Sequence, residues 1–484
     1  MSEMKLCEAV LGEFLPMTEI PRPSHHEERI SKYLFDWAVS RGLHAERDEL
    51  GEVIIDKPAS PGCENVPRLI MQAHMDMVCV AAEGVKFDPL TDGVKAVREG
   101  DTLRAEGTSL GADNGIGVAM ALCMLKDPDL KHGPLRAVFT VNEEDGMASI
   151  GLAPEYLEGG YLINLDWETL GSLCNSCAGG DYFNFYRDCG WESTPKRSVA
   201  IELSLSGFLG GHSGVGINLG HANALVSAAT ALEYLRQNGV SFRLAAFEGG
   251  QAKNAIPASA RAVITLTVAD AQRAMELLDA FKAEFAGAFR DIEPGGIFTA
   301  SLAGAPERVL SEECGYGLVG LMSAVPNDVF TMSPFVDGLV ESSANLGVIS
   351  IGEERAGFTL FARSSSSYRA EQTGIICKAL ARAFGFELEC EGHVPGWAVN
   401  PNSVLTRIAC EQYKLLTGKD MVVEPVHAGV ECGAFAEKNA QLDMISIGPT
   451  LADVHTPNES CDLRSVEITT ELLRRIIEAA AGAN

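Results

Sequence analysis

The chain has 484 residues, of which 46% are hydrophobic and 21% are charged, and its formal net charge is −28. This length exceeds the usual size of one hydrophobic core, so two or three domains are expected. The negative charge argues against a nucleic acid or an anionic membrane as a partner, because either would need a basic surface.

The N-terminal 24 residues lack the basic region and the long apolar run of a signal peptide. No stretch of about 18 uninterrupted apolar residues occurs, so we expect no membrane span. The 13 cysteines are odd in number and scattered through apolar segments, which is typical of reduced, mostly buried thiols. These features predict a cytoplasmic protein.

The first 185 residues alternate apolar strand-like runs with helical patterns, which indicates a mixed sheet flanked by helices. Strands are predicted over 52–58, 67–78, 135–142 and 159–168, and helices over 29–42 and 115–126. Ser24 and Glu27, just before the first helix, have the spacing of a capping box.

From about residue 186 the pattern becomes that of an antiparallel α+β domain. Strands are predicted over 197–207, 241–250 and 260–268, with helices over 221–239 and 271–289. A similar order recurs around residues 300–390, which favours a duplicated insert. The α/β rhythm returns at about 396. We therefore expect an α/β domain formed by 1–185 and 396–484, interrupted by an α+β domain at 186–395.

Glu143 and Glu144 are adjacent carboxylates at the end of a predicted strand. Neighbouring side chains of a strand point to opposite faces, so both can serve one site only where the strand ends. The turn signal at Gly146 fits such an end. A solvated strand end is the alternative interpretation.

His74 lies two residues before Asp76, so both side chains point to the same face of a strand. A metal-bound histidine normally donates its other ring N–H to such a carboxylate. A histidine that is hydrogen-bonded inside the core is the alternative.

Asp113 lies among glycines at the start of a predicted helix. Glycines let the backbone approach another group closely, whereas aspartate is also favoured as a helix N-cap. A phosphate-binding loop is discounted, because the glycine spacing does not match and a central acidic residue would repel phosphate.

Asp166 lies at the end of another predicted apolar strand, and His455 follows a further one. The candidate ligands are thus His74, Asp113, Glu144, Asp166 and His455. In α/β sheets, ligands bind in the crevice beyond the strand ends. Nitrogen and oxygen donors in this mixture suit two divalent cations such as zinc, bridged by one carboxylate. Two such ions would also neutralise most of the negative charge of the carboxylates that gather in this crevice.

Two other patterns point less clearly to a site. The run from His25 to Glu28 opens a helix, so capping explains it better than metal binding. Cys174-x-x-Cys177 has no second such pair and no thioredoxin-like context, so we interpret these as loop thiols.

The motifs resemble those of the co-catalytic zinc aminoacylase/carboxypeptidase family of metallopeptidases. They are HMD at 74–76, GADNG at 111–115, NEEDG at 142–146, LDWE at 165–168 and HTPNE at 455–459. Longer segments, such as GGHSGVGINLGHANA and HAGVECG, are similar to the branch of aminoacyl-histidine (cytosolic non-specific) dipeptidases. The resemblance spans nearly the whole chain. It implies a zinc-peptidase catalytic domain with a ferredoxin-like lid as the insert.

The resemblance assigns roles to the catalytic residues. Glu143 matches the general base and Asp113 the bridging ligand. His74 with Asp166 would hold one metal, and Glu144 with His455 the other. Asp76 matches the aspartate that orients a ligand. The Asp113–Asn114 bond falls where relatives carry a cis peptide.

The lid and the substrate pocket are assigned in the same way. His212 matches a lid histidine that stabilises the oxyanion, from the same subunit or from its partner in an expected homodimer. Asn254 and Arg363 resemble residues that hold the substrate's C-terminal carboxylate, which suits a planar guanidinium. His427 and Glu431 resemble a substrate-pocket motif.

The implied activity is hydrolysis of short unblocked dipeptides, including Xaa-His, by a zinc-activated water with Glu143 as general base. Cobalt and manganese suit the same ligands. Three alternatives stay open: an N-acyl amino acid deacylase of the same fold, a catalytically silent metal- or peptide-binding relative, and a structural protein with solvated acidic loops.

Overall fold

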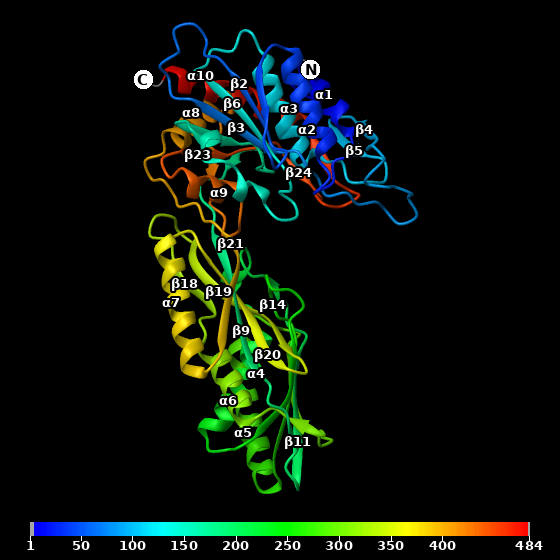
Figure 1. Cartoon of the computed structure of the whole chain (residues 1–484), viewed down its shortest axis with the longest axis vertical. Coiled ribbons are helices and arrows are strands. Elements are labelled where there is room, and N and C mark those ends of the chain that lie inside the picture. The colour runs from blue at the N-terminus through cyan, green and yellow to red at the C-terminus, as the bar shows by residue number, and fades with distance from the viewer. Residues whose placement is uncertain (1–3, 483–484) are drawn as a thin grey trace. The chain divides into compact units, whose positions relative to one another are not determined.

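The computed structural model describes residues 4–482, which form two compact units (Figure 1). The first unit runs to Cys177 and resumes at Trp397–Pro425 and from Val430 onward. The second unit comprises Ala178–Gly396 and Val426–Gly429. It is inserted into the first, so the expected fold class, an α/β domain interrupted by an α+β domain, is confirmed.

A six-stranded sheet forms the centre of the first unit. In spatial order its strands are β1 (His44–Arg47), β2 (Val53–Lys57), β6 (Leu135–Thr140), β3 (Leu69–His74), β7 (Tyr161–Asn164) and β23 (Asp443–Ser446). β6, β3, β7 and β23 are parallel, and β1 and β2 are joined by antiparallel pairing. Because parallel strands end at one edge, the segments after β6, β3 and β7 leave the sheet side by side.

Helices cover this sheet. They are α1 (Lys5–Thr18), α2 (Glu28–Ser40), α3 (Ala112–Lys126), α8 (Val404–Thr417), α9 (Glu431–Lys438) and α10 (Leu463–Gly482), with 3-10 turns η1 (Ala148–Gly151) and η2 (Pro154–Leu157). α3 is apolar on all sides, and every residue from Ala112 to Leu125 is buried. It packs on β3 and against α1 and α10.

Short strands complete the first unit. An antiparallel sheet contains, in order, β24 (Leu451–Ala452), β25 (Ser460–Asp462), β5 (Thr102–Ala105) and β4 (Ala96–Glu99). β8 (Ser172–Leu173) pairs with β22 (Val422–Val423). The loop between β24 and β25 carries His455, so this small sheet fixes both ends of a loop that reaches the candidate site.

The second unit holds two larger antiparallel sheets. One contains, in order, β13 (Arg243–Gly249), β15 (Ala260–Thr267), β11 (Ser198–Ser206) and β16 (Ile297–Ala303). The other contains β18 (Asp328–Met332), β19 (Val340–Ile351), β20 (Arg355–Ser364), β9 (Gly179–Asp188) and β21 (Glu387–Val394). Two short pairs join β12 (Gly211–His212) to β14 (Ala255–Ile256) and β10 (Glu192–Ser193) to β17 (Arg308–Val309).

Four helices pack on these sheets. They are α4 (Ala224–Gln237), α5 (Val268–Phe289), α6 (Glu312–Ala324) and α7 (Ser367–Phe384), and η3 (Ile217–Leu219) is a single turn. Side-chain oxygens of Asn223, Thr267 and Ser311 cap α4, α5 and α6 by accepting backbone N–H groups. These caps satisfy donors that a helix start otherwise leaves unpaired.

The sequence predicts reduced, mostly buried thiols and no membrane-spanning helix. The described residues include all 13 cysteines; none of them forms a disulfide bond, and most are buried, Cys174 and Cys177 among them. Across residues 4–482 we find no helix with the length and apolar character needed to cross a bilayer.

Candidate active site

Three parallel strands bring candidate residues to one edge of the main sheet. His74 is the last residue of β3, Glu143 and Glu144 follow β6, and Asp166 follows β7. β3 lies between β6 and β7, so these three segments are neighbours. The edge beyond the carboxyl ends of parallel strands is the usual place for a ligand.

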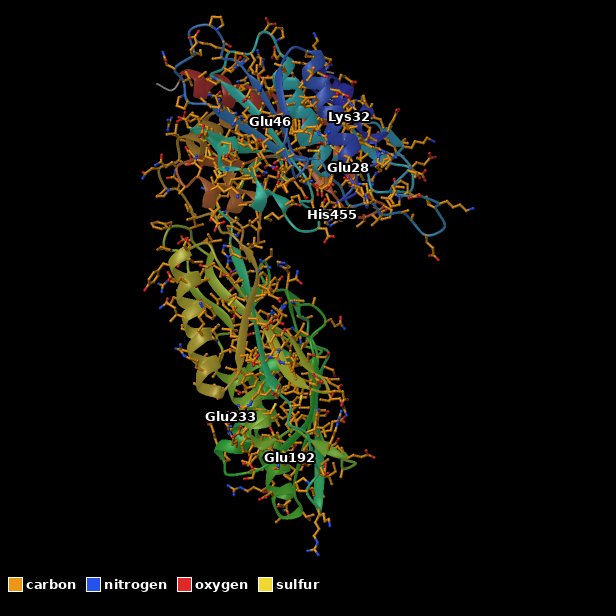
Figure 2. All side chains as sticks on the ribbon, viewed as in Figure 1. Glu28, Lys32, Glu46, Glu192, Glu233 and His455 are labelled. Atoms are coloured by element: carbon orange, nitrogen blue, oxygen red, sulfur yellow. The ribbon has the colours of Figure 1, made fainter. Side chains whose placement is uncertain are left out.

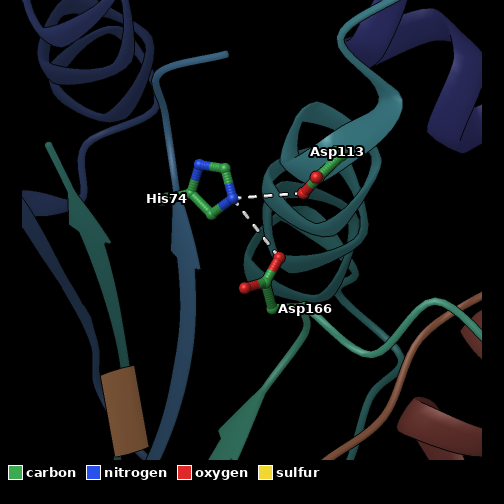
Figure 3. A group of neighbouring side chains, drawn as sticks. All are labelled: His74, Asp113 and Asp166. Atoms are coloured by element: carbon green, nitrogen blue, oxygen red, sulfur yellow. Dashed lines mark hydrogen bonds and ion pairs between the residues drawn. The ribbon is translucent and has the colours of Figure 1, made fainter. Parts of the chain in front are cut away.

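His74, Asp113 and Asp166 form the first cluster (Figure 3). Nε2 of His74 lies 3.2 Å from Oδ1 of Asp113 and 3.3 Å from Oδ1 of Asp166. The His74 ring is buried, with 1% of its surface exposed. Burial lowers its pKa, but the surrounding carboxylates, Asp166 first, outweigh burial and raise the pKa well above its usual value.

Asp113, Glu144 and His455 form the second cluster. Nε2 of His455, labelled in Figure 2, lies 3.1 Å from Oδ2 of Asp113 and 2.9 Å from Oε2 of Glu144. Hydrogen bonds to these two carboxylates raise the pKa of His455 to about 10. Both clusters therefore favour positive charge, the property expected of a site that binds cations.

Asp113 belongs to both clusters because of the loop that carries it. Gly111 adopts φ +69°, and the Asp113–Asn114 peptide bond is cis, as the motif predicts. The Asn114 amide donates a 2.6 Å hydrogen bond to Oδ1 of Asp166. A Cβ atom at Gly117 would lie 2.0 Å from Oδ1 of Asn114, so only glycine leaves room for this side chain.

Asp76 lies behind the first cluster on the same face as His74, as its spacing predicts. Its Oδ1 is 3.4 Å from Nδ1 of His74. It also accepts hydrogen bonds from the backbone N–H groups of Glu143 and Glu144, at 3.1 and 3.2 Å. Burial opposes ionisation of Asp76, but the contact with His74 and hydrogen bonds from the Ser24 hydroxyl and the Glu143 N–H lower its pKa to about 2. Asp76 thus orients the His74 imidazole and fixes the backbone turn that carries Glu143 and Glu144.

Glu143 lies close enough to His74, Asp166 and Glu144 for their charges to act on it. Burial raises its pKa well above the usual value, and the carboxylates of Asp166 and Glu431 add to that rise. A carboxyl group whose proton affinity is raised can accept a proton near neutral pH.

The expected capping box is wrong. Glu27 occupies the N-cap of α2, but no side chain caps that helix. The Ser24 hydroxyl instead donates a 2.8 Å hydrogen bond to Oδ2 of Asp76. Oε1 of Glu27 accepts from the backbone N–H of Asn142, at 2.9 Å, in the turn before Glu143. Neither residue is therefore available for capping, because both support the candidate site.

Glu431, expected to line a substrate pocket, lies in the interior. It is 1% exposed at the start of α9, inside the first unit. Its Oε2 accepts hydrogen bonds from Gln72 in β3, at 2.6 Å, and from Thr140 in β6, at 3.1 Å. This carboxylate joins β3 to β6, and its charge acts on Glu143 and Asp166.

The other four expected residues lie in the second unit. The β12–β14 pair brings His212 next to the segment of Asn254, whose carbonyl accepts from the N–H of Ser213 at 2.9 Å. Nη2 of Arg363 is 3.5 Å from Nε2 of His212. Nε2 of His427 is 2.7 Å from Oγ of Ser343.

Gly214 marks where three of these residues meet. A Cβ atom there would lie 2.3 Å from the carbonyl of His427, 3.0 Å from Cε1 of His212 and 3.2 Å from Nε of Arg363. The second unit thus gathers His212, Arg363 and His427 into one cluster of nitrogen-bearing side chains, which we call the lid cluster.

Comparison with known proteins places this geometry in a family. The model of Peptidase family M20/M25/M40 matches residues 70–479. The chain belongs to this family. It is therefore a metal-dependent hydrolase of peptide bonds, and the relationship drawn from its motifs is confirmed.

Individual relatives agree with this assignment. The chain is 33% identical over 472 residues to the cytosol non-specific dipeptidase of Escherichia coli K12, covering 96% of each chain. The crystal structure of aminoacylhistidine dipeptidase from Vibrio alginolyticus superimposes with a TM-score of 0.92 at 32% identity, covering 97% of this chain and 96% of that one. Aminopeptidase PepT from Bacillus cereus shares the fold at 16% identity, with a TM-score of 0.57 and coverage of 98% and 99%.

Sequence reasoning missed several residues of this peptidase site. Glu168 lies close enough to Asp113 and Glu144 for their charges to act on it, and burial raises its pKa to about 7. Arg22 and Glu459 hold the loop before Asp113 through its backbone. Glu459 is part of the HTPNE motif, and this position could have identified it as a site residue. Nothing in the sequence distinguishes Arg22 in the same way.

Proposed function

We propose that this peptidase is a dipeptidase whose catalytic unit holds two divalent cations. The observation that carries the proposal is the position of Asp113, whose two carboxylate oxygens face Nε2 of two different histidines. One carboxylate shared between two nitrogen-and-oxygen clusters is the arrangement that a pair of bridged metal ions needs.

The residues fit such a pair of ions. His74 with Asp166 would hold one ion, His455 with Glu144 the other, and Asp113 both. When bound, the ions supply Lewis-acid charge that polarises a peptide carbonyl and lowers the pKa of water from near 16 to about 7. Zinc suits these donors best, and cobalt or manganese also suits them.

Glu143 carries the proton in this proposal. It takes a proton from the attacking water and passes it to the nitrogen of the leaving amine, acting as general base and then as general acid. Its backbone is fixed by the hydrogen bond to Asp76, so its carboxylate stays beside the clusters.

Arg363 binds the C-terminal carboxylate of the dipeptide. Arg363 is 7% exposed, and its guanidinium stacks on Phe361, with Cζ 4.2 Å from the ring centroid. No carboxylate of residues 4–482 forms an ion pair with it, and its Nε donates no hydrogen bond. Burial lowers its pKa to about 10. A buried cation without a counter-ion is costly, and a substrate carboxylate would supply the missing charge.

His212 donates to the substrate from the same cluster. Its Nδ1 accepts hydrogen bonds from the N–H groups of Gly214 and Val215, at 3.2 and 3.1 Å. A ring nitrogen that accepts carries no proton, so the proton is on Nε2. Burial and the charge of Arg363 lower the pKa of His212, which keeps the ring neutral. Two donors that face each other, His212 Nε2 and Arg363 Nη2, converge on an anionic oxygen of the substrate.

Asn254 and His427 complete the substrate site. Asn254 is exposed beside His212, where its amide can donate to the substrate. Burial, with the charge of Arg363, lowers the pKa of His427 to about 4, so this ring is neutral and held by Ser343. A neutral ring beside Arg363 leaves the guanidinium as the single positive charge of the lid cluster.

We further propose a cytoplasmic homodimer acting on small peptides, including Xaa-His. Mixed dimers of the Glu143→Gln and His212→Ala variants show whether His212 acts in the active site of its own subunit or in that of its partner. Recovery of activity in mixed dimers would place His212 in the partner's site. No recovery, with mixed dimers demonstrated, would place it in its own.

A substrate panel tests the proposed function. Metal-stripped protein, with and without added zinc, is given β-Ala-His, Gly-His, Leu-Gly, a tripeptide and N-acetyl-methionine. Zinc-dependent cleavage of the dipeptides alone is expected. Preferential cleavage of N-acetyl-methionine would make the chain a deacylase, and no cleavage with any metal would make it a silent relative.

A further inference from the structure

Glu459 binds the backbone of the loop that carries Asp113. Its carboxylate accepts hydrogen bonds from the N–H groups of Leu110, Gly111 and Ala112 at 2.6, 2.9 and 2.8 Å, and from that of Asp113 at 3.3 Å. Glu459 is 2% exposed, so these bonds are shielded from water. Hydrogen bonds to a buried ionised carboxylate are about twice as strong as those between neutral groups.

These N–H groups lie at the start of α3, where a helix leaves donors unpaired. An aspartate at the start of a helix normally turns its own carboxylate back to accept such donors. Here the N-cap is Gly111, which has no side chain, and Glu459 satisfies the donors from another segment of the chain. The carboxylate of Asp113 is therefore free to face His74 and His455.

Arg22 binds the same loop through a carbonyl. Its Nη2 donates a 2.6 Å hydrogen bond to the carbonyl of Gly111, and its Nη1 donates to the carbonyls of Met75 and Asp76 at 2.9 and 3.1 Å. The guanidinium thus joins the end of β3, next to His74, to the loop of Asp113. Cβ atoms at Gly111 and Gly115 would lie 2.6 and 2.7 Å from Nη2, so both glycines are needed for this approach.

The charges of Arg22 and Glu459 are not compensated by ion pairs with other described residues. Across the described residues, no carboxylate forms a hydrogen bond or ion pair with Arg22, and no cationic side chain forms one with Glu459. Arg22 is 2% exposed. Burying two unpaired charges is expensive, and here each is compensated by backbone groups on either side of Gly111.

We propose that Glu459 and Arg22 are positioning residues that keep the Asp113 carboxylate available for metal and so set the metal affinity of the site. This inference rests on the proposed metal centre. When a residue that orients a metal ligand is replaced, metal affinity typically falls by about 10- to 100-fold.

Metal affinity tests the proposal directly. Co²⁺ dissociation constants of metal-stripped wild type, Glu459→Gln and Arg22→Met are measured by chelator competition, and the visible Co²⁺ spectrum reports the geometry. We expect a roughly 10- to 100-fold weaker affinity in each variant and an altered spectrum. The double variant should lose less than the product of both effects, because both residues hold one loop.

Arg136→Met is the matched control. Arg136 is also buried, pairs with Asp56 at 2.8 and 2.9 Å, and binds carbonyls of Glu155 and Tyr156. It lies at the start of β6, away from the strand ends that carry the site. Its loss should cost stability and leave Co²⁺ affinity unchanged.

The outcomes separate this inference from the proposed function. Wild type that binds no Co²⁺ would overturn the metal centre itself. Wild-type Co²⁺ affinity in folded Glu459→Gln and Arg22→Met would overturn only the positioning roles. If Glu459→Gln does not fold, Arg22→Lys is decisive: it keeps the charge but loses the forked geometry, and unchanged affinity there contradicts the inference.

Discussion

The Ser24 hydroxyl donates a 2.8 Å hydrogen bond to Oδ2 of Asp76, the carboxylate that faces His74 and holds the turn of Glu143 and Glu144. Ser24→Ala removes this donor and leaves the backbone donors in place. We expect kcat to fall about 10- to 150-fold with little change in KM, since a hydrogen bond to a charged group contributes about 1.5–3 kcal/mol. Ser24→Thr keeps a hydroxyl and should retain most activity. Full activity in Ser24→Ala would mean that the backbone alone fixes Asp76.

Glu143→Gln separates proton transfer from metal binding. The amide occupies the same space but cannot accept a proton, so kcat should fall by about 10²–10⁴ while metal content stays at the wild-type level. Asp113→Ala is the companion variant, and it should lose both metal and activity. Metal analysis and steady-state kinetics on the two variants make the comparison. Loss of metal in Glu143→Gln would reassign Glu143 as a ligand.

Arg363 should bind the C-terminal carboxylate of the substrate. Arg363→Lys keeps a charge but loses the planar fork, so we expect KM for Leu-Gly to rise about 10-fold or more, from the loss of a bidentate charged contact. Cleavage of Leu-Gly amide, which lacks the carboxylate, should be poor in wild type and should change little in the variant. An equal loss on both substrates would contradict carboxylate binding by Arg363.

Glu52 makes the stability of the first unit depend on pH. It is fully buried, and no N–H or O–H of the described residues donates to either carboxylate oxygen. Burial, with the nearby carboxylate of Asp48, raises its pKa from the usual 4.5 to about 9. The folded protein therefore retains a proton that the unfolded chain loses, so this contribution to stability is complete below pH 4.5 and is lost as the pH rises toward 9.

The neutral variant Glu52→Gln tests this behaviour. Its Tm should exceed that of wild type by several degrees at pH 8, and the difference should vanish near pH 4.5. Glu49→Gln, which changes an exposed carboxylate three residues away, is the control and should follow wild type throughout. A constant difference between Glu52→Gln and wild type across this range would show that Glu52 is ionised in the folded state.

The sequence predicted the catalytic unit well because its strands are short apolar runs with polar residues just beyond them. β3, β6 and β7 follow from such runs, and polar residues that recur at the ends of several strands indicate one shared site beyond the sheet. The period of two also placed His74 and Asp76 on one face correctly.

The remaining contacts depend on segments that meet only in the folded chain. Ser24 fits a capping box by local spacing, but a carboxylate 52 residues away takes its hydroxyl. Glu431 lies in the HAGVECG motif, but its hydrogen bonds to Gln72 and Thr140 could not be read from that motif. Arg22 binds only carbonyl oxygens, which leave no trace in side-chain patterns.

The most direct test of the account is a crystal structure of the zinc-loaded protein, with anomalous scattering measured at the zinc edge. We predict two anomalous peaks, one among His74, Asp113 and Asp166 and one among Asp113, Glu144 and His455, with ligand distances of about 2.0–2.2 Å. A single peak, or a pair of peaks that does not share Asp113, would contradict the bridged centre.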